Sequence, residues 1–483
     1  MSTIFIGKQP QNVLQKFWDI SQVYCRGADH CEGVSKFMVE FGENLGLETI
    51  MDSVGNVIIK KPATAGYEQA PVIMLASHMD MIFEKNPGVE HDFYTEPLKL
   101  LLADDNDTIY ADGTTLGADN GIGVAFVMAV LESDCLAHPA IEAVFTVNEE
   151  TDMKGAWQLD YSKLKSKIIL SLDAARLSLG GSGELEVEME LAKTMTPSRP
   201  GHTFFTLSIS GLLGGHSGNN AYSERGNAVT LLCRILIDLR EKYQIRIVSY
   251  KGGDGMSSAL AREAGCTFGI NKQHLDAVQN TVKEWAGVYV SEMAVPDPGI
   301  KVLLTQAAES YSQTCDDKTT DQLLTLLNIL PDGIVSLHKY FQRKVESCVN
   351  VGVVETKNDH FWVTCLIRSA VATKKYFLLG KIQRICKLLN VPYKIGRDLP
   401  QWDYVKDSRL SAVIKDIYSD LEPNIGQGTF ELGIFLKHMP GAEAAGIGTI
   451  VDTPHSPNEK LSISAVQDNW SRFIRVLEAL KEY

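Results

Sequence analysis

The sequence predicts an α/β protein: a first domain built on a sheet flanked by helices, interrupted by an inserted α+β domain. Three observations predict this fold. Short apolar runs alternate with helical segments in the first half of the chain. Residues 184–191 alternate strictly between polar and apolar, which is typical of a half-exposed strand. Candidate metal ligands occur before and after the intervening stretch, so the chain must leave the first domain and return to it.

The elements of the first domain follow from local patterns. Apolar residues with a 3.6-residue period predict a helix over 11–47. Gly-Asn between two apolar runs predicts a bend within 52–59. Small and apolar residues predict a buried helix over 121–131, with Asp119 at its start accepting backbone N–H groups.

Gly180 to Gly183 predict a flexible joint before the inserted domain. Beyond the joint the sequence predicts alternating strands (203–209, 245–250, 361–367) and helices (228–243, 273–285, 376–389). Helices are again predicted after residue 400, at 408–421 and 466–480. The predicted domains are 1–184 with 400–483 for the first, and 185–399 for the inserted one.

Composition excludes several classes of partner. The net charge of the 483 residues is −14 and no basic run occurs, which argues against nucleic acid and anionic membranes. Nine cysteines, without a Cys-x-x-Cys pair, indicate a reducing compartment and hence a cytoplasmic protein. We expect no signal peptide, and no apolar stretch approaches the roughly 20 residues that span a bilayer.

Five residues form a candidate two-metal site: His78, Asp119, Glu150, Asp173 and His455. Four of them follow a short apolar run that predicts a strand, and ligands gather beyond the carboxyl ends of strands in open α/β sheets. Each residue alone has an ordinary explanation as a helix cap, a loop residue or a solvated charge. Their shared position at strand ends favours a metal site.

Histidine nitrogens and carboxylate oxygens are ligands that zinc prefers. Two histidines and three carboxylates suffice for two metals that share one bridging carboxylate, for which Asp119 is the best candidate. Asp80 lies two positions after His78, on the same side of a strand, and can orient it. Glu149 adjoins Glu150 and can move protons.

Four motifs carry a family resemblance: SHMDM at 77–81, LGADNGIG at 116–123, NEETDMKGA at 148–156 and PHSPNEK at 454–460. They resemble the peptidase D family, the aminoacyl-histidine or Xaa-His dipeptidases and bacterial carnosinases, within the dinuclear zinc peptidases and deacylases. Shorter matches place the resemblance over nearly the whole chain. It implies a catalytic domain with a central mixed sheet and an inserted lid that also forms a homodimer.

The resemblance also implies roles for single residues. His78 and Asp173 would hold one metal, Glu150 and His455 the other, and Asp119 would bridge them. Glu149 would be the general base and acid, and Asp80 would orient His78. The metals are usually zinc, with manganese or cobalt as alternatives, and the substrates are Xaa-His or broader dipeptides.

Residues of the inserted domain have further implied roles. His216 matches a lid histidine that reaches the scissile carbonyl, often from the partner subunit. Without the family, a Gly-rich turn with a solvent-facing histidine is the favoured explanation. Arg368 matches an arginine that binds the substrate carboxylate, and its alternative is a structural ion pair. Asn350, and Glu431 outside the inserted domain, are the other implied substrate-binding residues.

The chain departs from the family pattern at Arg176, Ser258 and Gln427, where acidic residues, asparagine and histidine are usual. These departures put substrate choice in question and leave two alternatives open. One is an amidase or deacylase of N-acyl amino acids, which Arg176 motivates. The other is a metal-binding interaction protein without catalysis.

Overall fold

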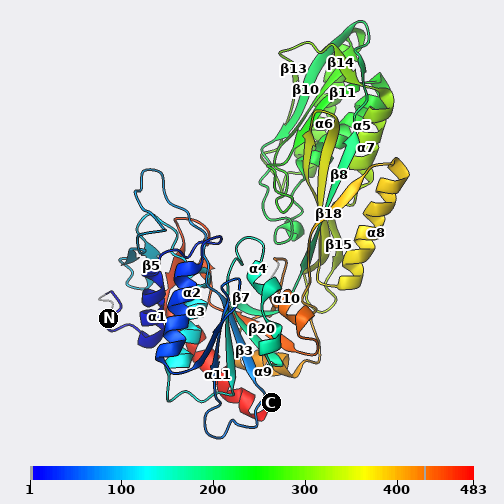
Figure 1. Cartoon of the computed structure of the whole chain (residues 1–483). Coiled ribbons are helices and arrows are strands. Elements are labelled where there is room, and N and C mark those ends of the chain that lie inside the picture. The colour runs from blue at the N-terminus through cyan, green and yellow to red at the C-terminus, as the bar shows by residue number, and fades with distance from the viewer. Residues whose placement is uncertain (1–3, 429–430) are drawn as a thin grey trace. The chain divides into compact units, whose positions relative to one another are not determined.

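The computed structural model describes residues 4–428 and 431–483, with the side chains of 174–176 also outside the description. The chain forms two compact units (Figure 1). The first contains Met1–Gly180, Tyr404–Ile425 and Phe430–Tyr483, and the second contains Gly181–Asp403 and Gly426–Thr429. The predicted boundaries after residues 184 and 399 fall close to these limits.

A mixed seven-stranded sheet organises the first unit, in the order β1-β2-β6-β3-β7-β19 with β20 beside β7. The strands at its centre, β6, β3 and β7, run parallel, and β1 and β2 are antiparallel. Its strands are β1 (Glu48–Met51), β2 (Val57–Lys61), β3 (Ile73–His78), β6 (Ile141–Thr146), β7 (Ile168–Gly181), β19 (Asn424–Gly426) and β20 (Glu443–Gly448). A small second sheet contains β4 (Leu100–Leu102), β5 (Thr108–Ala111), β21 (Val451–Asp452) and β22 (Lys460–Ser462).

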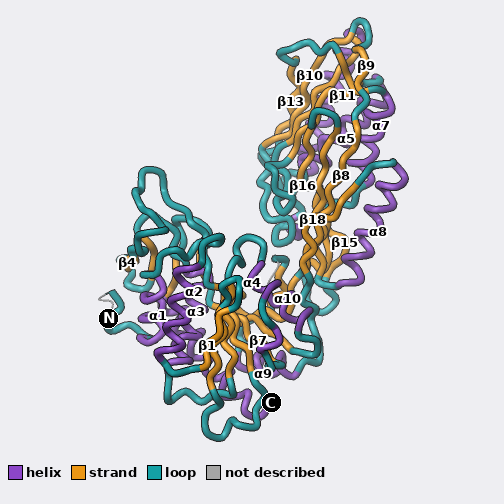
Figure 2. Tube along the Cα trace, in the orientation of Figure 1, coloured by secondary structure: helices purple, strands orange, loops and turns teal. Residues whose placement is uncertain are grey.

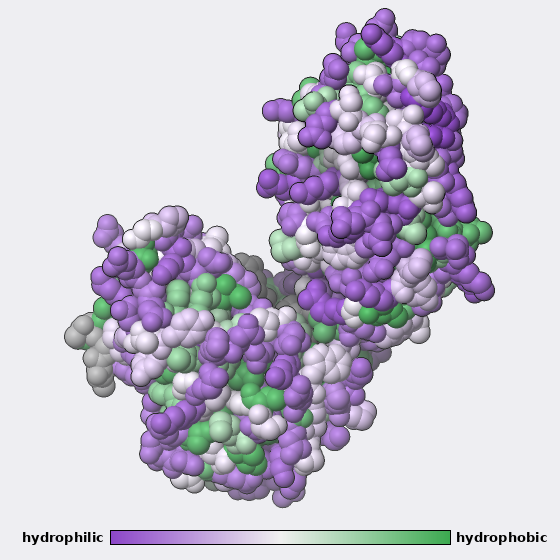
Figure 3. Space-filling model, turned by 45° about the horizontal axis from the view of Figure 1, so that its top comes forward, coloured by the Kyte–Doolittle hydropathy of each residue, from purple (hydrophilic) through white to green (hydrophobic). Residues whose placement is uncertain are grey.

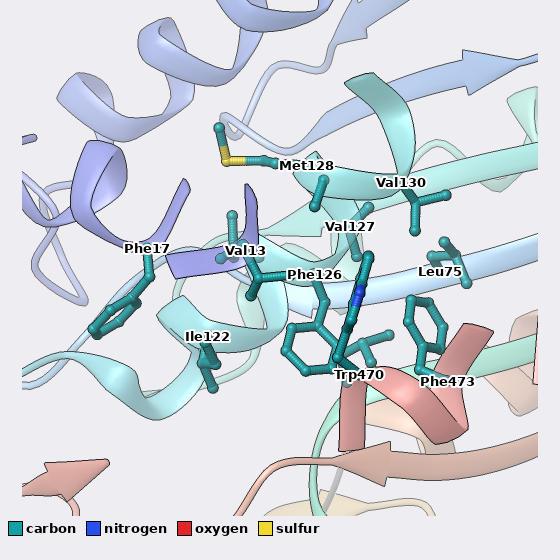
Figure 4. Close-up of a cluster of buried hydrophobic side chains, with 14 of the residues drawn as sticks. Val13, Phe17, Leu75, Ile122, Phe126, Val127, Met128, Val130, Trp470 and Phe473 are labelled. Atoms are coloured by element: carbon teal, nitrogen blue, oxygen red, sulfur yellow. The ribbon is translucent and has the colours of Figure 1, made fainter. Parts of the chain in front are cut away.

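Helices cover the sheet of the first unit (Figures 1 and 2). They are α1 (Gln11–Ser21), α2 (Glu32–Asn44), α3 (Ala118–Glu132), α4 (Lys154–Gln158), α9 (Arg409–Ile417), α10 (Glu431–His438) and α11 (Ile463–Ala479). The core beneath them is aromatic and aliphatic (Figure 4), and Phe126 of α3 meets Trp470 of α11 edge-on at 5.2 Å between ring centroids. Burial of such side chains is the main force that holds the helices on the sheet.

The single helix predicted over 11–47 is two helices. The chain leaves helical geometry after Ser21 and resumes it at Glu32. Between them Arg26 is buried and donates to Met79 O, and Gly27 makes a bridge to Met81. A tertiary hydrogen bond from a buried guanidinium therefore competes with helix continuity, and local periodicity does not reveal it.

A nine-stranded antiparallel sheet forms the second unit, in the order β13-β10-β12-β11-β16-β17-β8-β18 with β15 beside β16, and helices lie along one side of it (Figure 2). Its strands are β8 (Gly183–Ala192), β10 (His202–Ser210), β11 (Arg246–Gly252), β12 (Ala264–Asn271), β13 (Lys301–Gln306), β15 (Gly333–Leu337), β16 (Val345–Thr356), β17 (His360–Ser369) and β18 (Tyr393–Leu399), and β9 (Met195–Pro197) pairs with β14 (Gln313–Cys315). Its helices are α5 (Ala228–Tyr243), α6 (Leu275–Glu292), α7 (Asp317–Ile329) and α8 (Ala372–Leu389).

The glycines predicted as a flexible joint lie in strands instead. β7 continues to Gly181 and β8 begins at Gly183. A Cβ on Gly183 would lie 2.5 Å from Leu399 O, and Gly181 forms a bridge with Trp402. Close approach of two backbone segments explains these glycines better than flexibility does.

Hydrophilic side chains dominate the face of the molecule drawn in Figure 3, with hydrophobic residues in small separate groups. Among the described residues, no helix has both the length and the apolar character needed to cross a membrane.

Candidate metal centre

The carboxyl ends of β3, β6 and β7 bring the first candidate ligands together. His78 is the last residue of β3 and pairs with Thr146, the last residue of β6. Glu150 follows β6 after a short loop. Pairing between β3 and β7 ends at Ser171, so Asp173 lies just past the part of β7 that pairs with β3. Parallel pairing therefore sets these three side chains at one edge of the sheet.

Asp119 faces a different histidine with each of its carboxylate oxygens. Its Oδ1 lies 3.4 Å from His78 Nε2, and its Oδ2 lies 3.3 Å from His455 Nε2. His78 Nε2 is also 3.5 Å from Asp173 Oδ1, and His455 Nε2 is 3.0 Å from Glu150 Oε1. The five predicted ligands thus form two groups that share Asp119.

The donor atoms of this cluster suit a divalent metal. Ligand atoms of His78, Asp119 and Glu150 all lie within 4.8 Å of one another. His78 Nδ1 is 3.2 Å from Asp80 O, which leaves the lone pair of a neutral ring on Nε2. Glu150 Oε1 is buried, and although His455 Nε2 lies 3.0 Å away, the angle does not make a hydrogen bond. Imidazole nitrogens that face carboxylates, one of them with a buried oxygen that accepts no hydrogen bond from the described residues, fit the ligation of a divalent metal.

The pKa shifts of the clustered histidines and of Asp119 also show that this site favours a positive charge. Burial alone would lower the pKa of His78, but the carboxylates of Asp119, Asp173 and Asp80 raise it well above its usual value. Asp119 and Glu150 raise the pKa of His455 to about 10. Although burial opposes it, the two histidines hold the pKa of Asp119 below its usual value. A proton or a metal cation between these groups relieves the repulsion of their lone pairs and charges.

Asp80 contacts His78, as the sequence predicted, and also the backbone of the two glutamates after β6. Its Oδ1 lies 3.5 Å from His78 Nδ1 and accepts the backbone N–H of Glu149 at 3.2 Å, while Oδ2 accepts that of Glu150 at 3.1 Å. Burial, together with the charges of Asp173, Glu431 and Glu150, raises the pKa of Glu149 well above its usual value. A carboxyl group with a raised pKa can hold a proton at neutral pH.

Glu431 lies beneath the same strand ends. Its Oε2 accepts the Thr146 hydroxyl at 2.8 Å, and its Oε1 is buried without a partner among the described residues. Burial raises the pKa of Glu431 to about 8, and the charges of Asp173 and Asp80 add to that shift. Its predicted contact with substrate stays a prediction.

In the second unit, His216 is held in a defined tautomer. Its Nδ1 accepts the backbone N–H groups of Gly218 at 3.1 Å and Asn219 at 2.9 Å. The neutral ring must therefore carry its hydrogen on Nε2. Burial, and then the charge of Arg368, lower the pKa of His216 to about 4. His216 is thus a neutral hydrogen-bond donor at physiological pH.

Arg368 is buried within the second unit. Its guanidinium pairs with Glu184, and it donates to Ser217 Oγ at 3.1 Å and to Gln427 O at 2.7 Å. This is the ion pair that was the alternative to substrate binding, so binding through Arg368 stays a prediction.

Asn350 donates to Ser257 O and Ala259 O, both at 2.8 Å. Ala259 bridges to His216, so Asn350 braces the loop beside the histidine. Gln427, one of the departures from the family pattern, donates its side-chain amide to Val345 O. The side chain of Arg176 lies outside the described residues, so the deacylase reading stays a prediction.

Two residues without a predicted role make hydrogen bonds to the segments that carry the candidate metal ligands. Arg26 links the strand end at Met79 to Gly117, donating at 2.6 Å and 3.1 Å. Glu459 accepts the N–H groups of residues 116–119, whereas the sequence predicted that Asp119 itself would accept helix N–H groups. That prediction is wrong, because no side chain of α3 caps its start. The position of Glu459 within the motif PHSPNEK, four residues after His455, was the sequence feature that could have indicated a role for it.

The mixed sheet, its cluster of two histidines and three carboxylates, and the separate antiparallel sheet define a hydrolase of the dinuclear-metal type. Residues 74–479 match the peptidase family M20/M25/M40. The chain belongs to this family, which implies a dinuclear metal centre. The α/β fold and the family resemblance predicted from the sequence are confirmed.

Relatives match over almost the full length. The chain is 30% identical to the cytosol non-specific dipeptidase of Escherichia coli, covering 96% of this chain and 98% of that protein. It superposes on the aminoacylhistidine dipeptidase of Vibrio alginolyticus with a TM-score of 0.90 at 30% identity, covering 99% and 98% of the two chains. An aminopeptidase from Bacillus cereus, with a TM-score of 0.55 at 15% identity, shares the fold.

Proposed function

We propose that this enzyme is a metal-dependent dipeptidase that hydrolyses Xaa-His or a broader set of dipeptides. The observation that carries the proposal is the carboxylate of Asp119, whose two oxygens face two different histidines at 3.4 Å and 3.3 Å. That arrangement is what a bridging ligand needs. The names of the Escherichia coli and Vibrio alginolyticus relatives support a dipeptide as the substrate.

His78 and Asp173 would hold one metal, Glu150 and His455 the other, and Asp119 both. Zinc suits these donors best, with manganese or cobalt as alternatives. When bound, two divalent cations polarise the scissile carbonyl and make water acidic enough to lose a proton near neutral pH.

Glu149 would take that proton on its carboxylate and return it to the nitrogen of the leaving amine. Its raised pKa supports this role, because the carboxyl group can then hold the proton between the two steps. Asp80 would hold the backbone of Glu149 and the ring of His78 through Oδ1, and the backbone of Glu150 through Oδ2. His216, neutral with its hydrogen on Nε2, would donate to the carbonyl oxygen as negative charge develops, from its own chain or from a partner.

The direct test is turnover of a dipeptide panel that includes Xaa-His peptides, β-Ala-His and an N-acetylated control, with zinc, manganese or cobalt. We expect free-amine dipeptides to be cleaved and a chelator to stop the reaction. Cleavage of the acetylated substrate alone would replace the dipeptidase with a deacylase. No turnover with any metal, by a protein that still binds metal, would leave a binding protein.

The second unit would form a homodimer through its edge. β13 ends the nine-stranded sheet, α6 packs beside it, and Val290, Val295 and Leu303 expose large apolar side chains there. An unpaired edge strand with apolar neighbours favours pairing with a second copy. Light scattering should give a dimer, and Leu303→Asp should give monomers, whereas Phe377→Asp on α8 serves as an exposed control. A monomeric wild-type protein would overturn this assembly.

A cytoplasmic location completes the proposal. All nine cysteines are free thiols, seven of them buried. The relative from Escherichia coli is named as a cytosolic enzyme. Fractionation of cells that produce a tagged chain should recover it with the cytosolic fraction, and recovery with an extracellular fraction would contradict this placement.

A further inference from the structure

The carboxylate of Glu459 binds the backbone that carries Asp119. It is 2% exposed, and it accepts the N–H groups of Leu116 at 2.8 Å, Gly117 at 2.9 Å, Ala118 at 2.9 Å and Asp119 at 3.1 Å. Each oxygen accepts two of these bonds. A charged acceptor makes each hydrogen bond about twice as strong as a neutral one.

The chain cannot satisfy these N–H groups locally. They lie at the start of α3, where helical N–H groups have no partner within the helix, and no side chain of the helix caps them. Asp119 has non-helical backbone angles and its side chain points to His78 and His455. Glu459 therefore supplies the bonds that a capping residue supplies elsewhere, and Asp119 stays free for another role.

Glu459 also belongs to the loop of another candidate ligand. It follows His455 by four residues, and its own N–H donates to Ser456 O at 3.0 Å within a tight turn. On the other side, Arg26 is 1% exposed and ties Gly117 O to Met79 O, next to His78. The segments of His78, Asp119 and His455 are thus joined by two buried charged side chains.

We propose that Glu459 is a positioning residue that sets the separation of Asp119 and His455 so that Asp119 can serve both metals. The inference rests on the proposed ligand roles of these two residues. Glu459 acts through backbone N–H groups and contacts neither substrate nor metal. Glu459→Gln would turn one acceptor into an amide donor that faces two N–H groups, so the segment 116–119 must shift and carry Asp119 with it.

The matched control is Glu142→Gln. Glu142 lies at the amino end of β6 in the seven-stranded sheet and is 3% exposed. It accepts hydrogen bonds from the N–H groups of Lys165 and Ser166 and from the Ser166 hydroxyl. Both variants therefore lose a buried carboxylate that accepts backbone hydrogen bonds in the same unit. Only Glu459 lies beside the candidate ligands.

Four measurements compare the two variants with the wild type: metal affinity, the visible spectrum of the cobalt-loaded protein, amide exchange in the metal-free protein, and steady-state kinetics. We expect Glu459→Gln to weaken binding of one metal and to lower kcat, each about 10- to 100-fold. Its cobalt spectrum should change, and amides 116–119 should exchange faster. KM should stay within about twofold, because no substrate contact is removed. Glu142→Gln should change thermal stability alone.

The inference is overturned if Glu459→Gln binds both metals and turns over as Glu142→Gln does. If Glu459→Gln does not fold, Glu459→Asp, which keeps the charge on a shorter side chain, is judged by the same four measurements. Asp119→Ala separates this inference from the proposed ligand set. If Asp119→Ala loses metal and the Glu459 variants do not, only the positioning role of Glu459 is overturned. If Asp119→Ala binds metal fully, the proposed ligand set is overturned, and the inference about Glu459 with it.

Discussion

Glu142 at the amino end of the central sheet and the candidate ligands Asp119 and Glu150 at its carboxyl end have different partners. At the amino end, the oxygens of Glu142 are filled by N–H groups of Lys165 and Ser166. At the carboxyl end, the oxygens of Asp119 and Glu150 face histidine nitrogens. A carboxylate whose oxygens accept backbone N–H groups already has its hydrogen-bond partners and serves the fold. A carboxylate that faces imidazole lone pairs still requires a cation, so chemistry is expected at the carboxyl end alone.

The largest loss of activity should follow Glu149→Ala. Removing the proton carrier should lower kcat about 1,000-fold. Metal content should be unchanged, because the alanine variant keeps all five predicted ligands. Stopped assays on an Xaa-His dipeptide, together with elemental analysis, measure both quantities. A variant that retains a tenth of wild-type turnover would remove Glu149 from its role.

His216→Gln should lower kcat about 100-fold, because the donor to the carbonyl oxygen is displaced. The acid limb of the pH–rate profile should not move, since the pKa of His216 is about 4 and the ring is already neutral above pH about 5. An acid limb that shifts with the substitution would show that His216 acts in its charged form.

The same depressed pKa has a consequence for stability. The unfolded chain takes up a proton on this histidine near pH 6.5 and the folded chain only near pH 4. Stability is therefore lost as the pH falls between these two values, and His216→Gln should lose less of it. Urea unfolding of the metal-free protein at pH 6.5 and 4.5 measures the difference.

Asp80→Asn should lower kcat about 10- to 100-fold. The amide would face either the N–H of Glu149 or that of Glu150, so one of these hydrogen bonds is lost. The control is Asp52→Asn, because Asp52 accepts three backbone N–H groups in the turn between β1 and β2. Equal turnover by the two variants would show that Asp80 does not position Glu149 or His78 for catalysis.

The smallest effect on activity belongs to the amino end. Glu142→Gln should leave kcat within about twofold and cost about 1–3 kcal/mol in the free energy of unfolding, because buried N–H groups lose acceptors. Denaturant unfolding and steady-state assays test both parts. A loss of activity without a loss of stability would break the contrast between the two ends.

Local pattern was enough to predict that the candidate ligands lie close together, because His78, Glu150 and Asp173 each follow an apolar strand and parallel strands end together. Local pattern was not enough to predict the residues whose hydrogen bonds hold the segments of these candidate ligands. Leu116 and its acceptor Glu459 are 343 residues apart, and a local rule gave the N–H groups to Asp119 instead. Arg26 lies in the break between α1 and α2, where its side chain donates hydrogen bonds to Met79 O and Gly117 O. Long-range polar bonds of buried side chains leave little trace in periodicity.

Anomalous diffraction from crystals of the zinc-loaded enzyme tests the central claim most directly. We predict two peaks per chain, one between His78 and Asp173 and the other between Glu150 and His455, with the carboxylate of Asp119 reaching both. A single peak, or two peaks that do not share Asp119, would contradict the account.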